Sequence, residues 1–135
     1  MNIERAKDDI TAAEDILGRD DLEGRPTLVD VAAYHVQQAA EKCLKHILHD
    51  WHGVDDTVQG FRTHNISSLL KMIEKRAPGF IAAHDDLNHF AFILTSWEAG
   101  SRYEDSACSK KPEVESALEM TKRLLDEIES RNQNS

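Results

Sequence analysis

The fold of this chain is decided by residues 33–48, which read AYHVQQAAEKCLKHIL. At helical spacing the apolar residues of this stretch share one side: Val36, Ala39, Ala40, Cys43, Leu44, Ile47 and Leu48. The polar residues share the other side: Gln37, Gln38, Glu41, Lys42 and Lys45. The segment therefore predicts a long amphipathic helix that buries one stripe and leaves its polar side in solvent.

The rest of the chain repeats this helical periodicity, with glycine and proline residues between the segments. Five segments result: Ile3 to Leu17, about 28 to 51, Ile66 to Ala77, Ala83 to Trp97, and Val114 to Ile128. No segment reads as a strand, and residues 52–62 predict a loop. Amphipathic helices bury their stripes against one another. The sequence thus predicts an all-α, up-and-down bundle of about five helices, a single domain over residues 1–135 with a frayed tail at 131–135.

Local signals refine these helices. Thr27 and Asp30 resemble a capping arrangement at the start of the second segment. Favourable ion pairs at i,i+4 spacing are expected between Glu41 and Lys45 and between Glu119 and Arg123.

Composition bounds the class of protein. Of the 135 residues, 40% are hydrophobic and 30% charged, which is typical of a globular chain. A net charge of −9 excludes a protein that grips nucleic acid over its whole surface. No apolar run reaches membrane-span length and no signal-peptide region begins the chain, so we expect a cytoplasmic protein without a membrane role. Cys43 is expected to be a buried hydrophobe and Cys108 to lie in a loop, which gives no disulfide framework.

Three short motifs occur in order along the chain: residues 34–45 (YHVQQAAEKCLK), 63–70 (THNISSLL) and 101–105 (SRYED). Together they resemble the HEPN domain family (higher eukaryotes and prokaryotes nucleotide-binding domain), in its minimal single-domain prokaryotic type. The resemblance implies a helical bundle similar to the substrate-binding helical domains of nucleotidyltransferases.

The resemblance implies one of two functions, because HEPN domains include both ribonucleases and non-catalytic partners. The nucleases carry an R-x4-6-H motif, in which the histidine moves a proton during RNA cleavage. No arginine here has a histidine at that spacing; His84 lies one position too far from Arg76. We therefore predict no catalytic residues and a binding module. It would be the helical partner of a small nucleotidyltransferase in a two-component, toxin–antitoxin-like complex, with a nucleotide as candidate ligand.

A third interpretation is a helical-bundle protein with a purely structural role, and the main alternative is a metal-independent ribonuclease with a diverged site. In that hypothesis Arg102 works with a histidine brought near by folding, either His35 or His64, and RNA becomes a partner.

The main candidates for ligand binding are Arg102 and Tyr103, which follow Gly100 closely in the sequence. Arg102 could hold a phosphate bidentately while Tyr103 offers a ring for stacking. The competing interpretation is that Arg102 only complements a helix dipole. The same groove could be lined by Gln37, Gln38 and Lys42. The competing interpretation is that these three side chains are simply exposed to solvent.

The remaining candidates concern metals and a second subunit. His46, His49 and His52 are spaced for a shared helical face, but surface histidines explain them better, and we predict neither metal nor cofactor. His64 is expected to help begin the third helical segment, and His35 to be half-buried with one hydrogen bond. Phe90 and Ala91 take the inward side of their segment, so the Phe92 ring is expected to face a second subunit in a homodimer.

Overall fold

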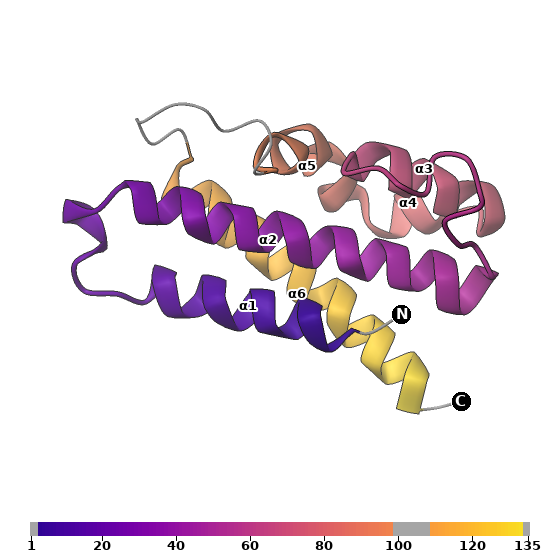
Figure 1. Cartoon of the computed structure of the whole chain (residues 1–135), viewed down its shortest axis with the longest axis horizontal. Helices are drawn as coiled ribbons and strands as arrows, with labels where there is room; N and C mark the ends of the chain where they lie inside the picture. The colour runs from indigo at the N-terminus through magenta and orange to yellow at the C-terminus, as the bar shows by residue number, and fades with distance from the viewer. Residues whose placement is uncertain (1–2, 99–108, 134–135) are drawn as a thin grey trace.

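A computed structural model describes residues 3–98 and 109–133, and every regular element in these residues is helical. The elements are listed in chain order: α1 (Glu4–Leu17), the 3-10 helix η1 (Leu22–Gly24), α2 (Thr27–His46), the π-helical turn η2 (Ile47–Trp51), α3 (Ile66–Arg76), α4 (Phe80–Ala83), α5 (Asp85–Ser96) and α6 (Lys111–Gln133) (Figure 1). The predicted all-α bundle is confirmed. The five expected segments correspond to the five long helices, and the short elements η1 and α4 were not predicted.

Helix α2 is the central element of the bundle. It packs against α1 and α6 on one side and against α3 and α5 on the other, so that Figure 1 shows it between two groups of helices. Its apolar stripe is fully buried, as the periodicity predicts: Val36, Ala39, Ala40, Cys43 and Leu44. A helix enclosed in this way has little surface left for solvent.

The helix ends show where local prediction works and where it does not. Helix α2 begins at Thr27 without a side-chain cap, so the capping expectation is wrong. The Asp30 carboxylate instead accepts a hydrogen bond from the backbone N–H of Ser109 at 2.9 Å, because the start of α6 lies beside it. Between α3 and α4, Gly79 adopts a left-handed φ of 98°, and Glu74 accepts hydrogen bonds from the backbone N–H groups of Gly79 and Ile81.

Helix α6 closes the bundle. It continues to Gln133, so residues 131–133 are helical rather than frayed, and the Arg131 guanidinium lies 4.0 Å from the centre of the Trp51 ring. Arg123 pairs with Asp86 of α5 and not with Glu119 as expected. These contacts join the C-terminal half of α6 to α5 and to η2.

Burial also changes the acidity of a cysteine side chain on α2. Cys43 has no exposed surface, and burial raises the pKa of its thiol from 9.0 to about 12. The expectation of a buried, hydrophobe-like cysteine is confirmed, whereas Cys108 lies outside the described residues.

Within 3–98 and 109–133, no helix has the length and apolar character needed to cross a membrane.

Candidate functional site

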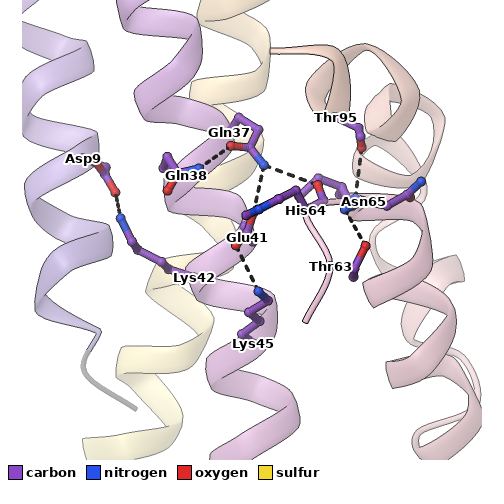
Figure 2. A network of polar contacts seen from close by, with 11 residues as sticks. Asp9, Gln37, Gln38, Glu41, Lys42, Lys45, Thr63, His64, Asn65 and Thr95 are labelled. Atoms are coloured by element: carbon purple, nitrogen blue, oxygen red, sulfur yellow. Dashed lines mark hydrogen bonds and ion pairs between the residues drawn. The ribbon is translucent and has the colours of Figure 1, made fainter. Parts of the chain in front are cut away.

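The polar side of α2 is not a solvent-exposed face. Gln37 has 0% of its surface exposed and Glu41 only 7%, so the expectation of solvent exposure is wrong for both. The cause is the loop after η2, which returns along α2 and places His64 against it, while α3 and α5 pack on the same side (Figure 2). Buried amide and carboxylate groups must find partners within the protein.

Glu41 is the centre of this buried polar group, and both of its carboxylate oxygens have partners. Oε1 accepts hydrogen bonds from Gln37 Nε2 at 3.1 Å and lies 2.8 Å from His64 Nδ1. Oε2 accepts from Lys45 Nζ at 3.1 Å, which confirms the predicted i,i+4 pair. Gln37 in turn accepts from Gln38 Nε2 at 2.7 Å. We call these five residues the Glu41 cluster.

The cluster reaches the surface through His64, whose side chain is 63% exposed. An ionised carboxylate can only accept hydrogen bonds, so the contact with Glu41 assigns the hydrogen to Nδ1 of the neutral ring. Nε2 then carries the lone pair that a proton or a ligand would meet. A buried carboxylate that orients a surface imidazole is an arrangement found in proton-transfer sites as well as in structural ones.

The role expected for His64 at the start of α3 is taken by its neighbours. Asn65 is the N-cap, and its side chain accepts a hydrogen bond from the backbone N–H of Ser68 at 3.0 Å. The backbone N–H of Ile66 donates to Thr95 Oγ1 of α5 at 3.0 Å. Asn65 and not His64 is therefore the N-cap of α3, and the His64 side chain contacts Glu41 of α2.

A second cluster of polar side chains, centred on a carboxylate, lies on the other side of α2. Asp9 of α1 accepts a hydrogen bond from Lys42 and lies 2.9 Å from His35 Nδ1. We call Asp9, His35 and Lys42 the Asp9 cluster. It confirms the half-buried His35 with one hydrogen bond, and it commits Lys42 to a partner in α1, away from Gln37 (Figure 2).

The predicted ligand groove is thus assembled only in part. Gln37 and Gln38 do lie together, but Lys42 belongs to the Asp9 cluster. Arg102 and Tyr103 lie outside the described residues. Sequence reasoning assigned no role at the site to Glu41 or Asp9, although the spacing of Gln37, Glu41 and Lys45 at i,i+4 marks one continuous row on α2.

A groove of about 410 Å³ opens between α3 and α5, next to the cap of α3. Its lining comprises Asn65, Ser67, Asn88, His89, Ala91, Phe92, Thr95 and Ser96. Asn65 and Thr95 connect this groove to the start of α3, one residue from His64.

The histidines of the η2 region do not form a metal centre. Asp50 lies 2.7 Å from His49 Nδ1 and 3.4 Å from His46 Nε2, which accounts for two of the three regularly spaced histidines. Across the described ranges, no group of three or more His, Cys, Asp or Glu residues could hold a metal ion.

Comparison with known proteins agrees with this fold. The family model for the HEPN domain matches residues 2–131, nearly the whole chain. The chain therefore belongs to the HEPN domain family. No curated protein and no solved structure matches it.

Proposed function

We propose that this chain is a HEPN binding module, the helical subunit of a two-component, toxin–antitoxin-like complex with a small nucleotidyltransferase. A nucleotide is the proposed ligand, and the Glu41 cluster is the proposed place where it binds. The single observation that supports this site is the half-buried set of oriented polar groups that reaches the surface at His64.

The chemistry of the cluster suits a phosphate and a base edge. The Lys45 ammonium has three hydrogens, and its contact with Glu41 uses one of them. A protonated His64 ring would add a second donor at the surface. Gln38, half-buried beside them, offers an amide of the kind that reads the edge of a base. Arg102 and Tyr103 remain proposed contacts, for the phosphate and for stacking.

The nucleotide site is tested by thermal melting with each nucleoside triphosphate. We expect nucleotide to raise the melting temperature of the unaltered protein and the shift to vanish in His64→Ala. His89→Ala is the matched control, because His89 is an exposed histidine whose Nδ1 contacts Asp85 one turn earlier in α5. An equal shift in His64→Ala and in the unaltered protein would contradict the proposed site.

The protein partner is tested separately by co-expression. A small nucleotidyltransferase encoded beside this chain should co-purify with it in a fixed ratio, and sedimentation should show one complex. Separate sedimentation of the two pure chains at every concentration would contradict the partnership while leaving the nucleotide site standing.

A metal-independent ribonuclease is the second candidate, and the Glu41–His64 contact favours it. Of the two histidines in that hypothesis, His35 is 29% exposed and held between α1 and α2, whereas His64 is far more exposed and oriented by a carboxylate. Pure protein in the presence of a chelator should then cleave RNA, and His64→Ala should abolish cleavage by removing the proton carrier. An RNA pool that stays intact with the unaltered protein would end this alternative.

A further inference from the structure

The groove between α3 and α5 has an exposed aromatic side chain in its lining. Phe92 has 86% of its surface exposed. It lies on the outward side of α5, because that helix buries Ala91 and Leu94 against the bundle. The lining contains no lysine, arginine, aspartate or glutamate. An exposed ring in an uncharged concave surface is typical of an interaction site.

Two half-buried polar side chains in the groove have no partner within the part of the chain that the structure describes. They are the Asn88 amide and the Ser67 hydroxyl. A carboxamide carries one carbonyl acceptor and one N–H₂ donor group, which complement the N–H and the C=O of a peptide unit. The backbone of a polypeptide segment can therefore supply the hydrogen bonds that these groups lack.

A row of lysines continues the groove along α3. Ser67, Lys71 and Lys75 are spaced four residues apart, so the row begins in the groove lining and follows one side of the helix. Both lysines are exposed, and among residues 3–98 and 109–133 neither has an ion pair. Glu74, the one carboxylate of α3, accepts hydrogen bonds from backbone N–H groups at the start of α4. We call Lys71 and Lys75 the lysine row, and it is a positive edge on a chain with a net charge of −9.

Helix stability does not account for the whole row. A lysine in the last turn, as Lys75 is, stabilises its helix by complementing the dipole. Lys71 lies in the middle of α3, more than one turn from its end, where this effect has faded. Other lysines with no such role, such as Lys42 and Lys122, are paired with carboxylates. Lys71 therefore has a charge that is open to a partner.

The charges of this surface distinguish between its possible occupants. A twofold contact with a second copy would bring the lysine row of one copy towards that of the other, and like charges oppose association. A nucleic acid strand carries a phosphate at every nucleotide and is repelled by the acidic remainder of the chain. A polypeptide segment needs carboxylates only where it faces Lys71 and Lys75, and it can be apolar over Phe92.

We propose that the groove and the lysine row bind a segment of another protein whose apolar side chains pack on Phe92 and whose acidic side chains pair with Lys71 and Lys75. The segment's backbone forms hydrogen bonds with the Asn88 amide. The inference does not depend on the proposed nucleotide site, and it does not require the partner to be a nucleotidyltransferase.

Selection from a displayed library of random short peptides, with the folded full chain as bait, tests this surface. The selected peptides should combine aromatic or aliphatic residues with aspartate or glutamate. Synthetic copies are then titrated with the protein by fluorescence polarisation. Phe92→Ser should raise their dissociation constants about 30-fold, as for a central aromatic anchor. Lys71→Glu should raise them about 10-fold, because it replaces an attraction by a repulsion.

Lys110→Glu is the matched control, because Lys110 is also exposed but lies before α6 and outside the groove lining. It changes the net charge by the same amount and should leave the dissociation constants unchanged, while circular dichroism shows all variants folded. His64→Ala should also leave peptide binding intact, which separates this test from that of the nucleotide site.

Several outcomes would overturn the proposal. A library that yields no binding peptide, selected peptides without acidic residues, or binding that survives both Phe92→Ser and Lys71→Glu would each do so. A dimer of the chain that Phe92→Ser dissociates would mean that a second copy covers the ring. An RNA oligonucleotide that binds more tightly than the peptides and is weakened by Lys71→Glu would mean that the lysine row binds phosphates.

Discussion

The Asp9 cluster and the Glu41 cluster have three kinds of side chain in common: a carboxylate, a histidine and a lysine. In each, a buried carboxylate contacts a histidine at Nδ1 and a lysine: His35 and Lys42 around Asp9, and His64 and Lys45 around Glu41. They differ in where the histidine comes from. His35 belongs to α2 and is enclosed between two long helices, whereas His64 arrives from a loop and stays mostly exposed.

This difference means that one cluster only joins two helices, whereas the other also presents an imidazole to solvent. The Asp9 cluster joins α1 to α2, and its most exposed side chains, His35 and Lys42, are each 29% exposed. The Glu41 cluster also holds a loop on α2, because the fully buried Gln37 donates from Nε2 to the His64 carbonyl at 3.4 Å, but its imidazole lies at the surface. The same chemistry is therefore structural on one side of α2 and a candidate binding site on the other. Three predictions test the comparison and a fourth tests the apolar side of α2, beginning with the largest expected effect.

Removing the carboxylate of the Glu41 cluster should cost the most stability. Glu41→Ala leaves the buried Gln37 amide short of a partner and Lys45 without its counter-charge, and we expect a loss of about 3 kcal/mol in the free energy of unfolding. Urea denaturation measures the change. Glu119→Ala is the control, because Glu119 is exposed and its contact with Lys122 is 3.8 Å long. A loss for Glu41→Ala no larger than for this control would contradict the account.

The Asp9 cluster should contribute less, because its members keep more contact with water. For Asp9→Ala we expect a loss of about 1.5 kcal/mol in the free energy of unfolding, as Lys42 and His35 can be partly rehydrated. The same urea measurement applies. A loss greater than that of Glu41→Ala would reverse the ranking of the two clusters.

Cys43 lies on the apolar side of α2 and should make the fold sensitive to alkaline pH. Its pKa is about 12 in the folded chain and near 9.0 when the thiol is solvated. The neutral thiol therefore stabilises the fold fully below pH 9, and this contribution is lost as the pH rises from 9 towards 12. Stability curves of the unaltered protein and of Cys43→Ala should converge over that range. Curves that stay parallel would contradict the burial effect.

Removing the exposed imidazole should affect stability least. His64→Ala should change the free energy of unfolding by no more than about 0.5 kcal/mol, because the ring is mostly exposed and Glu41 keeps its contacts with Gln37 and Lys45. His35→Ala should cost more, since the ring fills space between α1 and α2. Thermal or urea denaturation of the two variants side by side gives the comparison. Equal losses would mean that the two histidines play the same part.

The bundle was predictable because periodicity is local. Each apolar stripe, the loop after residue 51 and the Glu41–Lys45 pair follow from spacing within one segment. The burial of Gln37 did not follow, because an amphipathic pattern assumes one covered face and α2 is covered on both. The contacts within the two clusters could not be predicted either, because they join residues that are distant in the sequence. Asp9 lies 33 residues from Lys42, and His64 lies 23 residues from Glu41.

The central claim is that ligand contacts concentrate at the Glu41 cluster and spare the Asp9 cluster. The most direct measurement is an NMR titration that follows the ring signals of all seven histidines while a nucleoside triphosphate is added. The account predicts that the His64 signals move with saturation and that those of His35 stay in place. Movement of His35 without His64, or no movement of either ring, would contradict it.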